Sequence, residues 1–252
     1  MRKRAATVLG VLLLGAAALG QGPPDPAGRP PRPEDFPNIL SIAGRPARID
    51  EWPASRFTDL GAWFGYQLPP RGDVSLRTGF VGPFLMDEGN WAGLTLAQLR
   101  LEDDSGRELG AEQAEDVEAV AFPGRLHQRY RCDGFEVALD LVFVSGRSAV
   151  VRATVKNAGK QPRRVGIGWG GEGIDGGGLF TASPADVRLE TPRHGRVVIV
   201  PMTPGAARPF VPPGGNAFSI RPAAPTLLAP GETTLSYLGH VVCAAGEDEA
   251  AA

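Results

Sequence analysis

Hydrophobic and polar residues alternate along most of the chain after residue 62. The clearest runs have an apolar residue at every second position: Phe135, Val137, Leu139, Leu141 and Phe143, followed by Ala149, Val151, Ala153 and Val155. A period of two is typical of a β-strand that buries one face and leaves the other in contact with water. No window of about 12 residues or more has a convincing helical period. The pattern therefore predicts antiparallel β-sheets rather than helices.

Turn sequences separate these runs at the places where hairpins need them. Residues 103–106, 132–134 and 157–160 combine Gly with Asp or Asn, which favour tight turns. The alternation changes phase once between Leu94 and Leu101, which indicates a β-bulge. The chain also carries 24 prolines and 34 glycines, spread along its length. We predict an all-β fold, an antiparallel β-sandwich of the supersandwich type with about a dozen strands.

The two ends of the chain depart from this pattern. A basic group, an apolar run and small residues before Gln21 are the pattern of a signal peptide, and seven prolines follow without a hydrophobic period. The last residues are only Ala, Gly, Glu and Asp after Cys243. The predicted divisions are a signal peptide at 1–20, a Pro-rich linker at 21–37, the β-sandwich domain at 38–243 with a first strand at 38–42, and a disordered tail at 244–252.

The signal sequence predicts an exported protein, periplasmic or extracellular. Its apolar run is shorter than the roughly 20 residues that a membrane span needs, and no second run follows, so we expect no membrane contact after cleavage. Removal of the first 20 residues changes the formal charge from −2 to about 26 − 3 − 28 = −5. This mild acidity gives no electrostatic footprint for nucleic acid.

The chain has two cysteines, Cys132 and Cys243. In an exported protein they can form one disulfide, because the compartment is oxidising. The alternative is two buried thiols that do not pair. The sequence does not give the distance between them, so both alternatives stay open.

The sequence motifs predict neither a metal site nor a cofactor site. His127, His194 and His240 stand far apart without Glu-x-x-His or Cys-x-x-Cys beside them, so we expect no metal site. His127 falls on the wetter face of its strand and is expected to be solvated. Residues 168–173 match the dinucleotide fingerprint by letter, but the glycine-rich 174–178 cannot open the helix that such a site needs. We interpret the run as a flexible loop and expect no cofactor.

The acidic residues do not form an evident catalytic pair. Glycoside hydrolysis needs two carboxyl groups on either side of the bond, about 5–10 Å apart. Asp87 and Glu88 are neighbours, and neighbours on a strand point to opposite faces. Glu172 and Asp175 lie in glycine-rich sequence that does not fix their geometry. Asp59 would face Glu88 only if their strands paired, so we assign no catalytic residue.

Residues 57–91 concentrate aromatic, acidic and glycine residues. The candidates for a carbohydrate-binding or domain-contact surface are Asp59, Trp63, Phe64, Tyr66, Asp87, Glu88 and Trp91. Aromatic rings offer flat faces for a sugar, and polar groups beside them give direction. The same rings also suit the core of a sandwich. An exposed surface predicts a large apolar patch around Trp63 and Phe64, whereas burial of those rings between the sheets would remove its main support.

Two motifs carry a resemblance to a known family. They are 57–69 (Phe-Thr-Asp-Leu-Gly-Ala-Trp-Phe-Gly-Tyr-Gln-Leu-Pro) and 79–88 (Gly-Phe-Val-Gly-Pro-Phe-Leu-Met-Asp-Glu), with a less specific strand–turn–strand pattern at 150–172. They resemble the N-terminal β-sandwich domain of bacterial family 63 glycoside hydrolases, which are α-glucosidase relatives. In that family an (α/α)6 barrel follows the sandwich and carries both catalytic acids. The resemblance implies that the 57–91 surface packs on such a barrel and helps to shape the rim of its sugar pocket.

The sequence ends where this resemblance places the barrel, so it implies no catalytic residue in this chain. We expect a non-catalytic accessory domain or fragment of a secreted α-glycosidase-like enzyme, whose partners are a separately encoded (α/α)6 barrel and an oligosaccharide. One alternative is a stand-alone secreted carbohydrate-binding or protein-interaction module. Another is an independent enzyme that uses Asp59 or Glu88.

Overall fold

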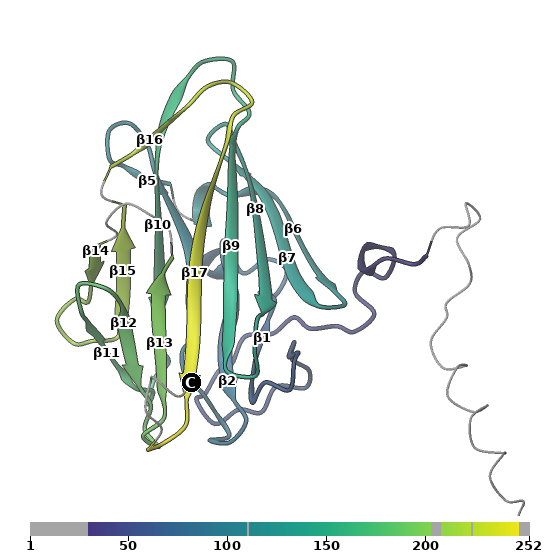
Figure 1. Cartoon of the computed structure of the whole chain (residues 1–252), viewed down its shortest axis with the longest axis vertical. Helices are drawn as coiled ribbons and strands as arrows, with labels where there is room; N and C mark the ends of the chain where they lie inside the picture. The colour runs from purple at the N-terminus through teal and green to yellow at the C-terminus, as the bar shows by residue number, and fades with distance from the viewer. Residues whose placement is uncertain (1–29, 110, 203–207, 223, 247–252) are drawn as a thin grey trace, which may run out of the picture.

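The computed structural model describes residues 30–109, 111–202, 208–222 and 224–246. Its strands form two sheets that pack face to face (Figure 1), which confirms the predicted all-β sandwich. The predicted signal peptide and most of the linker lie outside the described residues. The helical elements in the described part are three short 3₁₀ turns, η1 (Pro33–Asp35), η2 (Val74–Leu76) and η3 (Ala111–Gln113).

The first sheet has nine strands and follows the order β1-β2-β4-β10-β15-β14, with β3, β5 and β16 paired to β2, β4 and β10. Its strands are β1 (Phe64–Gln67), β2 (Val81–Leu85), β3 (Asn90–Trp91), β4 (Thr95–Glu102), β5 (Glu108–Leu109), β10 (Arg163–Glu172), β14 (Arg208–Phe210), β15 (Ala217–Arg221) and β16 (Thr226–Leu228). The pairings are antiparallel except for a short parallel contact between β2 and β4. Strand β1 forms one edge of this sheet.

The second sheet has eight strands in the order β11-β12-β13-β17-β9-β8-β7-β6, and it lies in front in Figure 1. Its strands are β6 (Glu115–Phe122), β7 (Arg125–Cys132), β8 (Phe135–Phe143), β9 (Ser148–Asn157), β11 (Leu179–Ala182), β12 (Val187–Glu190), β13 (Arg196–Pro201) and β17 (Thr233–Cys243). The register pairs Val137 with Val155 and Leu141 with Val151. The two alternating runs in the sequence therefore lie side by side with their apolar positions on the same face.

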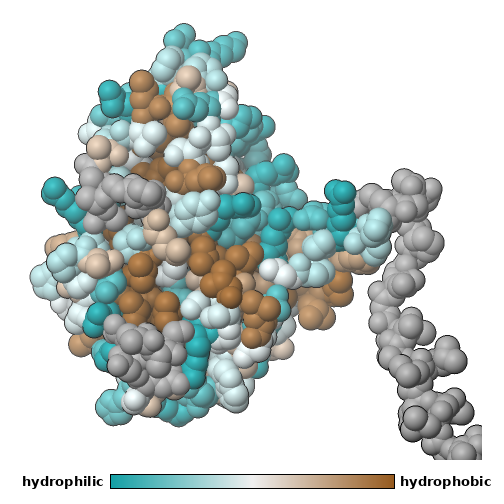
Figure 2. Space-filling model, in the orientation of Figure 1, coloured by the Kyte–Doolittle hydropathy of each residue, from teal (hydrophilic) through white to brown (hydrophobic). Residues whose placement is uncertain are grey.

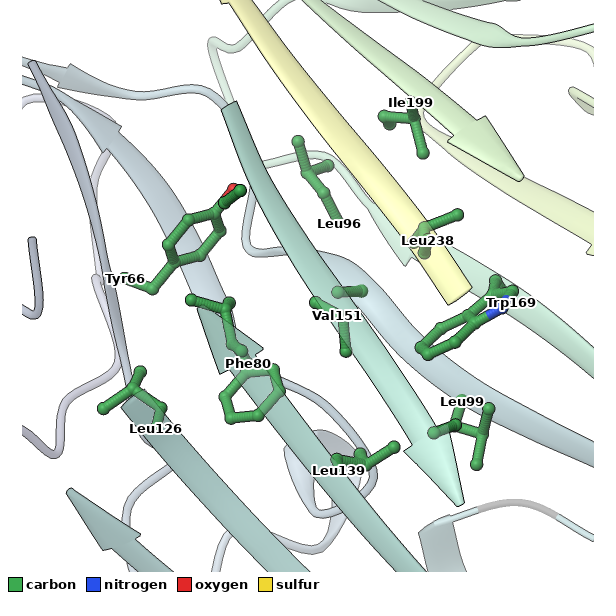
Figure 3. Packing of buried hydrophobic residues seen from close by; sticks show 14 of the residues in the cluster. Tyr66, Phe80, Leu96, Leu99, Leu126, Leu139, Val151, Trp169, Ile199 and Leu238 are labelled. Atoms are coloured by element: carbon green, nitrogen blue, oxygen red, sulfur yellow. The ribbon is translucent and has the colours of Figure 1, made fainter. Parts of the chain in front are cut away.

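The core lies between the two sheets. Val137, Leu139, Val151 and their alternating neighbours are buried there, and side chains of both sheets point toward one another in Figure 3. A smaller cluster with Phe84 and Trp91 lies apart from this main core. It packs with Ile49, because the chain before β1 crosses β3 and the Trp91 amide donates to the Ile49 carbonyl at 2.8 Å.

Two buried hydrogen-bonded groups join the sheets inside this apolar core. The Tyr66 hydroxyl lies 2.7 Å from His240 Nδ1, and His240 Nε2 lies 3.0 Å from the Leu96 carbonyl oxygen. The Trp169 indole nitrogen donates to Ser236 Oγ at 3.0 Å. Each bond links a strand of the nine-stranded sheet to β17, so the relative position of the sheets is set by polar contacts as well as by packing.

The predicted bulge is present, whereas the number of strands and the predicted first strand differ from the structure. Opposite Gly170 and Glu172 of β10 lie Gln98 and Thr95 of β4, so β4 carries one extra residue here, and the predicted bulge is confirmed. The described residues form 17 strands rather than about a dozen, because several strands are only two to four residues long. The strand expected at 38–42 does not form. Asn38 instead exchanges hydrogen bonds with Ala121 of β6, and an isolated bridge joins Ala43 to Leu68.

The glycine-rich run 168–173 is not the flexible loop that we expected. Gly168 to Glu172 belong to β10, which pairs with β4 on one side and β15 on the other. A Cβ atom at Gly170 would lie 2.3 Å from Arg100 Nε, and one at Gly171 would lie 2.3 Å from Phe218 Cε1. The glycines make room for side chains of the neighbouring strands, which is a common reason for glycine inside a strand.

We predict that Gly171→Ala lowers the free energy of unfolding by about 1–3 kcal/mol, because the methyl group has no space beside Phe218. Urea denaturation followed by tryptophan fluorescence measures the effect. Gly146→Ala is the control, since a Cβ there would lie at an ordinary 3.4 Å from the Leu60 carbonyl oxygen. Equal stability of the Gly171 variant and the parent protein would contradict this packing.

The structure overturns the possible disulfide. Cys132 and Cys243 are buried and are not joined to each other. Cys132 pairs with Phe135 of β8, and Phe135 pairs with Asn157 of β9. Asn157 lies next to the residue that pairs with Thr233, so Cys132 is at the same height in the sheet as the start of β17, whereas Cys243 is the last residue of β17. The ten residue steps of β17 separate these levels by about 33 Å. A disulfide needs the two Cα atoms within about 7 Å, so no local movement could close it.

Candidate functional site

The aromatic residues of 57–91 divide between the interior and the surface. Phe64, Tyr66 and Trp91 are at most 1% exposed, whereas Trp63 is 63% exposed. Trp63 and Phe64 are neighbours, so they point to opposite sides of the chain as it enters β1. The rings of Phe64, Tyr66 and Trp91 therefore cannot contribute to a contact surface, and of the expected patch around Trp63 and Phe64 only the Trp63 ring faces outward.

The three acidic candidates lie in different surroundings. Asp59 and Asp87 are exposed, and each accepts a hydrogen bond from the next backbone amide. Glu88 is buried, and its Oε1 accepts a hydrogen bond from Thr191 Oγ1 at 2.7 Å. Arg193 donates to the Glu88 backbone carbonyl. These contacts tie the turn between β2 and β3 to the turn between β12 and β13, which is a structural role for Glu88.

Asp59 and Glu88 do not form a catalytic pair. The Asp59 carboxylate lies beside Gly124, in the turn between β6 and β7. Glu88 contacts the turn between β12 and β13. Four strand spacings separate β13 from β7 in the sheet order, which is about 19 Å. This separation exceeds that of either class of glycoside hydrolase carboxylates.

An aromatic surface lies on the outer face of the sheet edge formed by β1 and β2. The Trp63 carbonyl accepts a hydrogen bond from the Met86 amide, so these two residues form the first row of the surface. Gly65 and Phe84 pair in the next row, and Gly65 leaves space that the Arg56 side chain fills. We call Trp52, Arg56, Trp63 and Met86 the tryptophan platform.

Trp52 supplies the second exposed ring of the platform. It is 60% exposed and packs edge to face on Phe84, with ring centroids 5.0 Å apart. Gly89 also lies against the Trp52 indole, because a Cβ at Gly89 would be 3.3 Å from its Cζ2 atom. The Arg56 guanidinium carbon lies 5.9 Å from the Trp52 ring and 5.7 Å from the Phe84 ring, which is within range of a cation–π contact.

Arg56 has no carboxylate partner in the part of the chain that the structure describes. Its Nη2 lies 3.2 Å from Met86 Sδ, a weak acceptor, and its Nε is buried and has no hydrogen-bond acceptor among these residues. A guanidinium that is partly removed from water usually pairs with an oxygen acceptor. Among the described residues, Arg56 therefore has no oxygen acceptor for its buried Nε, and its guanidinium lies beside the exposed Trp52 ring.

The platform adjoins one end of the sandwich, at the bottom of Figure 1. The loop at 59–61 lies against the turn between β8 and β9, where a Cβ at Gly146 would be 3.4 Å from the Leu60 carbonyl oxygen. The Val242 amide donates to the Arg147 carbonyl, so the end of β17 meets the same turn. Leu60 and Val144 expose more than half of their surface here. We call this region the lower end.

An apolar area on the outer face of the eight-stranded sheet continues from the lower end. The register places Val142, Val150, Gly239 and Val200 in one row across β8, β9, β17 and β13, with Val241 and Val198 in the next row. We call these residues the valine face. Met202 lies over Gly239, where a Cβ would be 3.1 Å from the Met202 sulfur. Figure 2 shows hydrophobic side chains gathered over the lower half of this sheet.

The upper part of the same sheet face is charged. His127 is not simply solvated as expected, because its Nδ1 lies 2.8 Å from Asp140 Oδ1, and Arg152 donates to Asp140 Oδ2 at 2.7 Å. Burial alone would raise the pKa of Asp140, but the hydrogen bonds from His127 and Arg152 outweigh it and lower that pKa. This group pairs its own charges and leaves no evident donor or acceptor for a ligand.

Other classes of site find no candidate among the described residues. No group of three or more His, Cys, Asp or Glu residues there is placed to hold a metal ion. No helix in the described ranges is long and apolar enough to cross a membrane.

A groove of about 320 Å³ lies between the N-terminal segment and the β6–β7 turn, and Ile39, Leu40 and Asp59 line it.

The tryptophan platform contains two residues that the sequence did not single out, Trp52 and Arg56. Both precede β1 in a segment without regular alternation, so periodicity gave no information about them. A tryptophan directly before Pro53, outside any strand pattern, was the available signal. Their position over Phe84 and Gly65 depends on the chain folding back over the sheet, which a local pattern does not report.

Comparison with protein families gives a match over much of the chain. The family model described as "Glucosidase YgjK, N-terminal" matches residues 49–198, which is more than half of the chain. The matched range includes the platform, the loop at 59–61, the turn between β8 and β9, and Val142, Val150 and Val198 of the valine face. It does not include Val200 or β17. A search of curated proteins finds no match.

Several solved structures have a similar fold. Polysaccharide lyase BACCELL_00875 is 10% identical with a TM-score of 0.47, over 71% of this chain and 32% of that one. A β-arabinopyranosidase is 9% identical with a TM-score of 0.46, over 71% of this chain and 38% of that one. Slr1438 from Synechocystis sp. PCC 6803 is 11% identical with a TM-score of 0.45, over 79% and 99%. The chain spans about a third of the first and second of these structures, and likenesses this distant say nothing about activity.

Proposed function

The chain belongs to the family of N-terminal domains of glucosidase YgjK, and from this premise we propose that it is a non-catalytic accessory domain that packs on a sugar-hydrolysing (α/α)6 barrel. The sandwich lacks a facing pair of carboxyl groups among the candidate acids, which supports a role without its own chemistry. We further propose the specific placement in glycoside hydrolase family 63, an exported protein, and a barrel that is encoded separately or downstream.

The observation that carries the proposal is the apolar lower end with its valine face. Outward residues on an antiparallel sheet are usually polar when that face meets water. Here the outward positions of four adjacent strands hold the partly exposed Val142, Val150, Val200 and Val241, with the buried Val198 beside them, and Leu60 and Val144 extend the area. A contiguous apolar area of this kind typically marks a contact with another domain.

We predict that Val150→Glu abolishes binding of the chain to a catalytic barrel and leaves the sandwich folded. Val150 is central in the first row of the valine face, and a buried, unpaired carboxylate in an interface is costly. The barrel is the helical domain encoded in or next to the same gene, co-expressed with an affinity-tagged chain. Co-purification and analytical ultracentrifugation measure the complex, and circular dichroism checks the fold.

Thr154→Glu is the matched control, because Thr154 lies four residues along β9 on the same outer face, outside the valine rows. This variant should bind the barrel as the parent does. A neighbouring gene without a helical catalytic domain would contradict the proposal. So would turnover of nitrophenyl α-glucosides by the purified chain above the blank, because it would mean that the chain carries its own active site.

A further inference from the structure

We propose that the tryptophan platform is a carbohydrate-binding site that holds a neutral gluco-oligosaccharide on the surface of the sandwich. Trp52 and Trp63 would stack against the C–H faces of pyranose rings, and Arg56 would donate hydrogen bonds to hydroxyl oxygens between them. The glucose-type ligand rests on the proposed function, whereas the site itself rests on the geometry of these side chains.

The two rings are spaced for a chain rather than for a single group. Trp63 stands two residues before Gly65, and Trp52 packs on Phe84, the partner of Gly65 on the adjacent strand. Two residues along one strand and one step across the sheet separate these positions by on the order of 8 Å. Both rings are about 60% exposed. The pairing of Trp63 with Met86 and of Gly65 with Phe84 puts Trp63 on the sheet face that carries Phe84 and Trp52. An extended oligosaccharide can therefore contact both.

The Trp52 ring and the Arg56 guanidinium are held in place before a ligand arrives. Phe84 and Gly89 support Trp52 on two sides, and Arg56 lies over Gly65 with its guanidinium beside Trp52. Glycine is required at position 65, since a Cβ there would lie 2.8 Å from the Phe57 carbonyl and 3.2 Å from the Arg56 side chain. A site that is already ordered loses little conformational entropy on binding, which favours affinity.

The charges around the platform favour a neutral ligand. Arg56 supplies one positive charge, and the exposed Asp87 directly follows Met86 of the platform, whereas the Asp59 carboxylate lies beside Gly124 in the turn between β6 and β7. The Asp87 carboxylate beside Met86 offsets the charge of Arg56, so the platform has no excess of positive charge to attract an acidic sugar. The Arg56 guanidinium lies beside the exposed Trp52 ring and can donate to hydroxyl oxygens through its Nη atoms, since Nη2 contacts only the weak acceptor Met86 Sδ among the described residues, and the Asp87 carboxylate can accept from hydroxyl hydrogens. This combination of apolar faces and a few polar groups is typical of a small-molecule site.

We predict that the purified chain binds maltoheptaose, isomaltoheptaose or cellohexaose, and that Trp63→Ala and Trp52→Ala each weaken this binding by about tenfold or more. Isothermal titration calorimetry measures affinity, and quenching of tryptophan fluorescence reports the contact. Arg56→Met should weaken binding as well, because it keeps the bulk over Gly65 and removes the donors. Phe210→Ala is the matched control, since Phe210 is an equally exposed aromatic residue in β14, at the other edge of the same sheet.

Absence of binding to all three neutral sugars would overturn the inference, as would binding only to a galacturonic acid trimer. Equal weakening by Phe210→Ala and Trp63→Ala would also overturn it. The outcome is separate from that of barrel docking. Val150→Glu, on the opposite outer face, should bind sugar like the parent protein, and Trp63→Ala should still bind the barrel. Circular dichroism and thermal unfolding confirm that each variant is folded.

Discussion

Replacement of Phe64 by Ala should lower the free energy of unfolding by about 3–5 kcal/mol, whereas Trp63→Ala, one residue earlier, should change it by less than about 0.5 kcal/mol. Phe64 is 1% exposed and packs on Phe143 and Tyr66, with ring centroids 5.1 and 5.9 Å away. Its removal leaves a cavity between the sheets. Trp63 points outward and leaves none. Urea denaturation of the two variants measures the difference.

This pair of neighbours separates a structural from a functional role in one experiment. Trp63→Ala should lose sugar binding at unchanged stability, and Phe64→Leu, a smaller change in the same core, should keep sugar binding with a moderate loss of stability. If Trp63→Ala unfolds as readily as Phe64→Ala, the Trp63 ring is part of the core and the platform does not exist as described.

The protein should lose on the order of 3 kcal/mol of stability as the pH falls from 6.5 to about 4, because of His240. Burial of His240 lowers its pKa from 6.5 to about 4, although the hydrogen bond to the Leu96 carbonyl acts in the other direction. Between these values the unfolded chain binds a proton that the folded protein does not. Acid therefore favours unfolding in this range, and urea midpoints measured at a series of pH values follow the loss.

His240→Gln removes the titrating group and should flatten the stability profile between pH 6.5 and 4, at a lower overall stability. The variant keeps polar atoms that can face the Tyr66 hydroxyl, whose own pKa burial raises well above 10. Asp140 also contributes an acid dependence, but its pKa is lowered from 3.8, so its contribution is lost only at lower pH. An unchanged slope in the His240 variant would show that another group causes the loss.

Residues 57–91 show how much of the candidate site the sequence patterns predicted. These patterns located the region, because aromatic, acidic and glycine residues crowd together in 57–91 and the family motifs lie there. They did not separate Trp63 from Phe64, Tyr66 and Trp91, because an aromatic residue with glycine neighbours has the same local pattern on either side of a sheet. They also missed Trp52 and Arg56, which reach the site from an irregular segment.

The strand faces and the fold class were determined by the sequence itself. An apolar residue at every second position specifies both a strand and the face that it buries, and this information is local. The phase change in β4 likewise located the bulge correctly. The glycines of β10 were misassigned, because a glycine that makes room for Phe218 and a glycine in a mobile turn look the same until the neighbouring strand is placed.

The arrangement of residues far apart in the chain was decided only by the tertiary structure. The strand order places Cys132 and Cys243 at opposite ends of one sheet and sends Asp59 and Glu88 to different turns. The same pairing brings Tyr66 to His240, 174 residues away, and aligns valines of four strands into one outer face. These outcomes follow from long-range register, which no local alternation of residues encodes.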